Sequence, residues 1–421
     1  FPDQELFIRN MCDEGNTPGF RPHPSRKSPW AFAGAERFQT ELAKGSGSRG
    51  HYKTPDEWLT RLQADTIIAF FGFNSSFAGP SGLKNFKGEL EAFVQHTLTQ
   101  RYNGDAPPQL VLVAPTAFQD LSAKYHTPNG AVENANLAIY TEAMREVAAK
   151  NGALFVDTFT ATLAWHESSD EYTTDGALLN ELGYRKLAPL LATAIFGQTA
   201  IAKPARRSTV HAAVREKTWC WLNEYKMPNG VHSSGRRYNP YGPQNYPDEF
   251  QKIREMTAIR DLAIAHALHG TDFDVAAADA KTHVLKAVPS NYKPSAKNGN
   301  PDYVSGEQSA KDLTVPEGYK IELFASEAEF PDLANPVQIS FDNKGRLWVA
   351  TMPSYPHYRI GDARPKDKLI ILEDTDGDGK ADKQTVFADN LHVPIGFEIA
   401  PEGVYVSQSG SLVLLEDHDG D

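Results

Sequence analysis

The stretch T-I-I-A-F-F-G-F-N at residues 66–74 decides how the first half of the chain folds. Its apolar run up to residue 71 is uninterrupted, which is typical of a strand buried on both faces of a parallel sheet. Ligands of open α/β sheets bind beyond the carboxyl ends of the strands, so we expect Gly72 and Asn74, where the run stops, to face a substrate. Glycine lets a backbone come close and an asparagine amide can donate to a developing oxyanion, although plain turns also favour both residue types.

Apolar strands alternate with amphipathic helices on both sides of this stretch, up to about residue 197. The pattern predicts strands at residues 5–10, 66–71, 109–115 and 153–157, and helices at residues 55–63, 83–102, 133–151 and 181–196. This alternation predicts a parallel sheet covered by helices, which we place in a domain spanning residues 1–200.

The composition changes twice after this domain. Residues 201–312 contain helical patterns at 214–225 and 247–269 between segments dense in Pro, Gly, Asn and Ser, which predicts a linker with a helical insert. From residue 313 onward the pattern becomes short strands separated by turn signals. These strands are predicted at residues 319–324, 337–341, 346–350, 368–373, 384–387, 403–407 and 412–416.

An internal repeat indicates the architecture of residues 313–421. The sequence L-I-I-L-E-D-T-D-G-D at residues 369–378 returns as L-V-L-L-E-D-H-D-G-D at residues 412–421, a spacing of 43 residues. That spacing is typical of a propeller blade and predicts the first blades of an all-β propeller. The first copy carries an aromatic, Pro-rich insertion at residues 352–366, and such insertions often carry function.

The charge balance and the cysteines exclude several classes of protein. The chain has 42 basic and 54 acidic residues, a net charge of −12, and no long basic run, which argues against nucleic acid or an anionic membrane surface as the main partner. No apolar stretch reaches transmembrane length. Cys12 and Cys220 are far apart, so neither a disulfide framework nor a cysteine metal site is predicted, and no C-x-x-C-H haem motif occurs.

The two ends of the sequence lead us to expect an internal fragment of a longer protein. Phe1 stands in the lead-in to a predicted strand, and Asp421 falls inside the second copy of the acidic motif. A signal peptide of the longer protein would then not be visible, so its absence says nothing about the compartment.

Three motifs in the first domain resemble the SGNH, or GDSL-type, hydrolase superfamily. They are R-N-M-C-D-E-G at residues 9–15, the Gly72–Asn74 turn, and T-T-D-G-A-L-L-N-E-L-G-Y at residues 173–184. The resemblance covers residues 1–197 and implies a three-layer, flavodoxin-like α/β fold. It also implies that Gly15 and Asn74 are oxyanion donors and that Asp175 is the acid of a catalytic triad.

The sequence departs from this family in two places. The nucleophile block of the family would precede residue 1, and the histidine of its D-x-x-H motif falls on Leu178. Leucine cannot accept a proton, and loss of one triad member typically lowers the rate by several orders of magnitude. His166 is the alternative base, although an ordinary surface histidine is the simpler interpretation. We therefore expect a weakened or lost hydrolase.

The acidic loop D-T-D-G-D-G-K-A-D at residues 374–382 is a candidate calcium site. Asp374, Asp376, Asp378 and Asp382 stand at positions 1, 3, 5 and 9 of a glycine-bearing turn, a pattern that surrounds a hard cation with oxygen. Thr385 takes the twelfth position, where an EF-hand has glutamate, so the loop resembles a calcium loop without being an EF-hand. The alternative is a solvated turn between blade strands.

Residues 313–421 resemble the propeller of the "membrane-bound dehydrogenase" proteins of Planctomycetes and Verrucomicrobia. The resemblance rests on V-P-E-G-Y at 315–319, F-D-N-K-G-R-L-W-V at 341–349, the acidic loop and L-H-V-P-I-G-F at 391–397. Those propellers are similar to sugar-dehydrogenase propellers, and the family implies haem or quinone only in parts outside this chain. It also implies a periplasmic or extracellular location.

Two functions stay open at this point. In the first, an ester-hydrolase-like domain is joined to a sugar-dehydrogenase-like propeller and acts on a small molecule or polysaccharide. In the second, both domains are non-catalytic modules that dock a polysaccharide or a partner in an exported redox protein.

Overall fold

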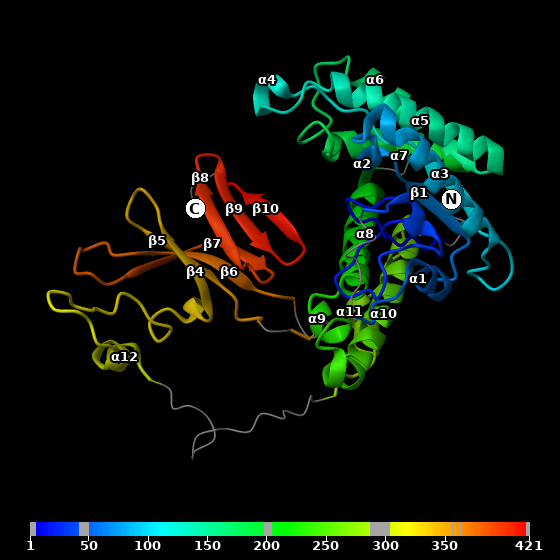
Figure 1. Cartoon of the computed structure of the whole chain (residues 1–421). Coiled ribbons are helices and arrows are strands. Elements are labelled where there is room, and N and C mark those ends of the chain that lie inside the picture. The colour runs from blue at the N-terminus through cyan, green and yellow to red at the C-terminus, as the bar shows by residue number, and fades with distance from the viewer. Residues whose placement is uncertain are drawn as a thin grey trace. The chain divides into compact units, whose positions relative to one another are not determined.

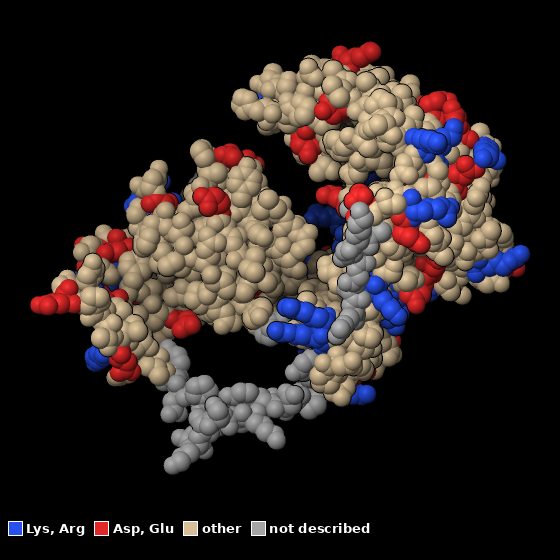
Figure 2. All heavy atoms as spheres, viewed as in Figure 1, with Lys and Arg blue, Asp and Glu red and all other residues tan. Residues whose placement is uncertain are grey.

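The computed structural model describes residues 6–41, 50–197, 204–286, 304–355, 358–359, 361 and 364–417 (Figure 1). The chain divides into two compact units, which we describe separately. The first comprises Phe1–Val210 and Val231–Gly242, and the second comprises His211–Gly230 and Pro243–Asp421. Acidic and basic side chains are scattered over the visible face in Figure 2.

A three-stranded parallel sheet forms the centre of the first unit. Its strands are β1 (Thr66–Phe70), β2 (Gln109–Val113) and β3 (Leu154–Val156), in the spatial order β1-β2-β3. The register pairs Ile68 with Val111 and Val113 with Val156. The parallel sheet that the alternation predicts is therefore confirmed, with β2 in the middle.

Helices cover both faces of this sheet, which confirms three layers. α3 (Gly79–Thr99) and α5 (Ala131–Asn151) pack on the face that contains Leu110 and Leu112. α7 (Glu181–Phe196) packs on the opposite face, where Leu190, Leu191 and Ile195 meet Val111, Val113 and Val156. Successive side chains along β2 point to opposite faces, so Leu110 and Leu112 contact α3 and α5 while Val111 and Val113 contact α7.

Two expectations for the strands of this unit are wrong. Ile68 and Phe70 of β1 are 38% and 46% exposed, so β1 is not buried on both faces. The reason is that β1 lies at the edge, and the α7 side chains pack against valines of β2 and β3. The described part of the predicted strand at residues 5–10 joins no ladder, since an apolar run becomes a strand only where it finds a partner.

The remaining elements of the first unit are short. They are η1 (Ala35–Phe38), α1 (Pro55–Arg61), α2 (Phe73–Ser76), α4 (Ser122–Tyr125) and α6 (Thr158–Trp165). The sequence pattern predicted α1 but not α6. Thr54, the N-cap of α1, forms a capping box with Glu57. Asp157 caps α6 by accepting a hydrogen bond from the Thr160 N–H.

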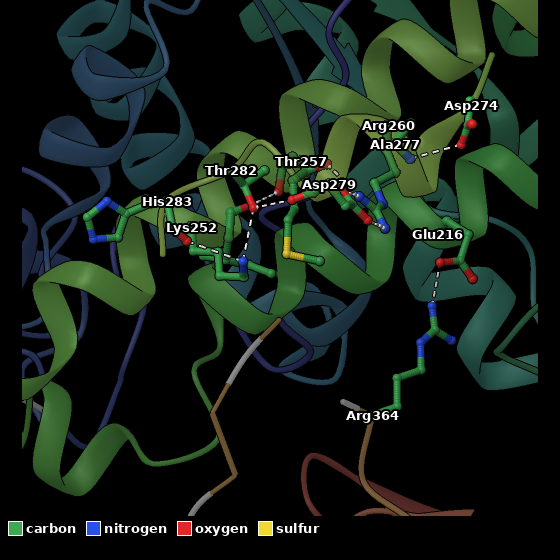
Figure 3. Close-up of polar contacts among 12 residues, drawn as sticks. Glu216, Lys252, Thr257, Arg260, Asp274, Ala277, Asp279, Thr282, His283 and Arg364 are labelled. Atoms are coloured by element: carbon green, nitrogen blue, oxygen red, sulfur yellow. Dashed lines mark hydrogen bonds and ion pairs between the residues drawn. The ribbon is translucent and has the colours of Figure 1, made fainter. Parts of the chain in front are cut away.

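Residues 204–286 form a helical region that belongs in part to each unit, and its residues in the second unit share a buried core. The helices are α8 (Pro204–Tyr225), α9 (Gly230–Ser233), α10 (Tyr238–His269) and α11 (Val275–Asp279). Cys220 and Ile253 are at the centre of the core. Polar contacts join α10 to α11 and to the residues after α11 (Figure 3). Arg260 of α10 pairs with Asp279 of α11, and Lys252 Nζ of α10 lies 3.0 Å from Thr282 Oγ1. None of the described helices has the length and apolar character needed to cross a bilayer.

Two antiparallel sheets follow α12 (Gly306–Asp312) and η3 (Pro331–Leu333). The first has the order β4-β5-β6-β7 and the second β10-β9-β8. Their bounds are β4 (Pro336–Phe341), β5 (Leu347–Thr351), β6 (Asp367–Glu373), β7 (Lys383–Leu391), β8 (Gly396–Ala400), β9 (Gly403–Gln408) and β10 (Ser411–Leu415). The side chain of Gln338 joins the sheets by bonding both the N–H (2.8 Å) and the carbonyl (2.7 Å) of Phe397.

The structure corrects two details of the predicted blades. Residues 319–324 form no strand, and the sequence analysis missed β8. The described residues form two sheets and no closed ring, so what they show is a β-sheet region.

The insertion at residues 352–366 contacts the helical region. Tyr358 donates a hydrogen bond of 2.6 Å to Asn223 Oδ1 and packs with the core around Cys220. Arg364 forms an ion pair with Glu216, shown in Figure 3. The Tyr358 ring also meets the His392 ring edge-on, with centroids 5.0 Å apart, so both residues are part of the packing in this unit.

Candidate functional site

The turn after β1 strongly favours glycine at position 72. Gly72 has a φ of 105°, and a Cβ there would lie 3.3 Å from Cδ of Pro115 and 3.2 Å from Sδ of Met144. Pro115 follows the end of β2, so the turn lies at the carboxyl ends of the strands. Asn74 is exposed in the short helix α2 that begins directly after Gly72.

A cluster around Phe118 connects this turn with the Asp175 motif. Phe118 packs with Ala114, Ala117, Leu137 and Phe159, and both Phe73 and Ala177 pack against the same cluster. Phe73 precedes Asn74, and Ala177 precedes Leu178. The structure therefore brings the two motifs to the same edge of the sheet, as the sequence analysis expected for Gly72 and Asn74.

Gln119 holds the loop that carries Asp175. Its Oε1 accepts hydrogen bonds from the Tyr172 N–H (2.9 Å) and from the N–H and hydroxyl of Thr173 (3.1 and 3.0 Å). Its backbone N–H donates to the Gly176 carbonyl at 2.8 Å. Sequence reasoning missed this residue, because nothing in the sequence around a single glutamine indicates a partner more than fifty positions away.

Asp175 shapes its own loop. Its Oδ1 accepts hydrogen bonds from the N–H groups of Ala177 (2.9 Å) and Leu178 (2.7 Å), and its side chain is exposed. Leu178 is 50% exposed, so the position where the family has histidine holds an apolar side chain that reaches solvent. The loop after Asp175 is therefore formed, but position 178 holds no group that would accept a proton.

His166, the alternative base, lies at the end of α6 and is half-buried rather than on the open surface. Burial lowers the pKa of His166, and the nearby Phe118 carbonyl offsets this only in part. Its ring stacks at 6.4 Å on Tyr172 and lines an open cavity of about 530 Å³ with Gln119 and Lys124. The described contacts include no hydrogen bond between His166 and Asp175, so the structure does not assign it as the base.

Gly15, the second expected oxyanion donor, lies in an exposed turn. No described atom comes within 4 Å of the position where a side chain on Gly15 would begin. The structure therefore does not bring Gly15 into contact with Asn74, and its role stays a prediction.

The acidic loop groups three of its four predicted ligands. Carboxylate oxygens of Asp374, Asp376 and Asp382 lie within 4.8 Å of one another. Asp378 is outside this group, and its Oδ1 accepts a hydrogen bond from the Lys380 N–H. Backbone N–H groups, that of Gly379 first, lower the pKa of Asp374 by bonding its carboxylate. Three clustered carboxylates are a donor set that fits a hard cation such as Ca²⁺.

The first unit is thus a helix-covered parallel sheet with a glycine turn and an Asp loop at one edge, a fold class that includes esterases. Its residues 18–186 match the GDSL-like lipase/acylhydrolase family and form a domain of that kind. Residues 305–421 match a domain of unknown function, DUF7133. Among curated proteins, none matches the chain.

Several solved structures are similar to part of the chain. LAE5, an alpha/beta hydrolase enzyme from the metagenome of Lake Arreo in Spain, is 16% identical over 39% of this chain and 67% of its own, with a TM-score of 0.27. A catalytic mutant of Axe2, an acetylxylan esterase from Geobacillus stearothermophilus, is 13% identical over 40% and 70%, with a TM-score of 0.28. The lipase/acylhydrolase from Enterococcus faecalis is 20% identical over 33% and 65%, with a TM-score of 0.25. The activities in these names belong to those proteins.

Proposed function

We propose that the first unit binds small acyl esters or acetylated carbohydrate and hydrolyses them weakly. Asn74 supplies a side-chain oxyanion donor, the Gly15 N–H supplies a second, and Asp175 takes the place of the triad acid. The observation that supports this assignment is the cluster around Phe118. Phe73, which precedes Asn74, and Ala177, which precedes Leu178, both pack against it.

The chemistry explains why the activity is weak. Donors placed where charge develops stabilise the oxyanion of acyl transfer and keep part of the rate enhancement without a base. Leu178 accepts no proton, so a water molecule that attacks the ester carbonyl, displacing the alcohol and leaving the acid, loses its proton without assistance from this position.

Asn74→Ala tests this function in the full-length protein. Removal of one oxyanion donor lowers kcat by about 10²–10³-fold in a serine hydrolase, so we expect p-nitrophenyl acetate hydrolysis to fall toward background. Initial rates are measured, with Asn151→Ala as a control, because Asn151 is the last residue of α5 and lies just before the start of β3, at the opposite edge of the sheet from the turn after β1. Equal rates in the parent protein and Asn74→Ala would remove Asn74 from the mechanism.

The second candidate function is docking without catalysis. The exposed Leu178 supports it, because an apolar side chain at this position suits contact with a ligand better than proton transfer. Under this function, acetylated oligosaccharide binds the first unit in titration calorimetry while no ester is hydrolysed.

We also propose that residues 313–421 begin a β-propeller similar to those of sugar dehydrogenases, in a protein that works in the periplasm or outside the cell. Any haem or quinone would be held by parts outside this chain. The repeat spacing of 43 residues and the bridge from Gln338 to Phe397 between successive sheets support the propeller.

The acidic loop supports a calcium site in this region, and calcium is expected to raise the melting temperature of the full-length protein. A ligand that binds only the folded state adds about 2.7 kcal/mol at a concentration 100-fold above its Kd. Asp376→Asn should abolish the shift, because Asp376 belongs to the group of three carboxylates. Asp378→Asn is the matched control and should keep most of it. No heat in titration calorimetry and no melting shift would leave the loop an ordinary turn.

A further inference from the structure

Glu89 is a buried carboxyl group in the core of the first unit. It lies on α3 with a relative exposure of 1%, and its helical neighbours Phe86, Leu90 and Phe93 belong to the hydrophobic core. A buried carboxyl group is strongly destabilising unless hydrogen bonds compensate for the lost water. Its partners therefore indicate why a carboxyl group is present here.

Among the described residues, the hydrogen bonds to this carboxylate come from residues 17–39, before α1. Oε1 accepts from Thr17 Oγ1 at 2.8 Å and from the Gly19 N–H at 3.1 Å. Nε2 of Gln39 lies 3.4 Å from both oxygens. A Cβ on Gly19 would lie 2.9 Å from Oε1, so this backbone is pressed directly against the carboxylate. Glu89 thus fixes residues 17–19, which begin two positions after Gly15.

Arg21 links the same segment to the end of β1. Its guanidinium lies 5.4 Å from the centroid of the Phe71 ring and 5.1 Å from that of Phe93. Phe71 directly precedes Gly72. Residues 17–21, which follow Gly15, are therefore held by a carboxylate on α3 and by a cation that packs against Phe71, the residue after β1.

We infer that Glu89 is a positioning residue, which fixes residues 17–19 and through them orients the neighbouring turn that carries Gly15, the second proposed oxyanion donor. This role rests on the proposed hydrolase function, because the donor matters only if an oxyanion forms. A core residue without this role would stabilise the unit as a whole and would not affect this segment selectively.

Amide hydrogen exchange in the full-length protein tests the positioning directly. We expect Glu89→Ala to speed exchange of the Thr17 and Gly19 amides at least about tenfold while the strands β1 and β2 keep their protection, since local opening is separate from global unfolding. Glu89→Gln keeps an acceptor oxygen for the Gly19 N–H and should restore slow exchange to within about twofold. Glu91→Gln is the matched control, because Glu91 is on the same helix and pairs with Lys150 at the surface.

Thr17→Val removes the hydrogen bond from Thr17 Oγ1 to Glu89 and leaves the Glu89 carboxyl group in place. It tests the inference if Glu89→Ala does not fold. It should also speed exchange of the amides at positions 17 and 19. Unchanged exchange there, or an equal rise throughout the sheet, would overturn the inference.

Ester hydrolysis gives a second readout. Glu89→Ala should lower kcat more than about tenfold with KM within about twofold, and Glu89→Gln should restore kcat. If the parent protein hydrolyses no ester, the proposed function fails while the exchange experiment still decides whether Glu89 fixes the segment. If the parent is active and Glu89→Ala keeps its kcat, the inference fails and the proposed function stands.

Discussion

Leu178→His is expected to raise the turnover of a small acetyl ester by at least about tenfold in the full-length protein, less than the roughly hundredfold or more that a well-positioned base contributes. The Leu178 N–H already bonds Asp175 Oδ1 at 2.7 Å, so the loop that would present the imidazole is formed. The gain should appear as the pH rises through about 6.5, where an ordinary imidazole loses its proton. Initial rates between pH 5 and pH 8, the range in which histidine changes its charge, check both expectations.

Leu178→Gln is the control for this gain. It introduces a polar side chain that accepts no proton at these pH values, so it should leave the rate unchanged. A Leu178→His variant with no gain would mean that the rest of the pocket no longer supports hydrolysis, and the docking function would then be favoured.

Gly176→Ala is expected to lower the free energy of unfolding by about 3 kcal/mol, the sum of overpacking and of a strained backbone. Gly176 has a φ of 92°, and a Cβ there would lie 2.5 Å from carbons of the Phe118 ring and 2.8 Å from the Gln119 carbonyl oxygen. Neither neighbour can move freely, because Phe118 is buried and the Gln119 backbone bonds this loop. Urea unfolding of the full-length protein measures the loss.

Gly104→Ala separates the two contributions. Gly104 has a φ of 81°, but no described atom lies within 4 Å of its Cβ position, so only the backbone strain, about 1 kcal/mol, applies. Equal losses at the two positions would contradict the close packing of the Asp175 loop on Phe118.

The candidate site was partly predictable from the sequence. Gly72 and Asn74 follow an apolar run, and that pattern alone predicts a strand end, which the structure shows. Asp175 and Leu178 were identified by a motif, and their loop does reach the same edge of the sheet through Ala177. Gln119 and Glu89 could not be predicted, because each holds a segment more than fifty positions away in the chain.

The sequence by itself determined the features that depend on local periodicity. The helix at Glu181–Phe196 and the repeat around the acidic loop follow from side-chain spacing within one segment, and so does the alternation of strands and helices. Only the tertiary structure decided which faces of the strands are covered by helices and which apolar runs pair with another strand. Ile68 and Phe70 stay exposed because α7 packs against β2 and β3, and residues 319–324 form no strand. Within the acidic loop, the local turn of the backbone places Asp378 apart from the other three carboxylates. Burial and strand pairing depend on contacts between residues far apart in the sequence, which local periodicity does not specify.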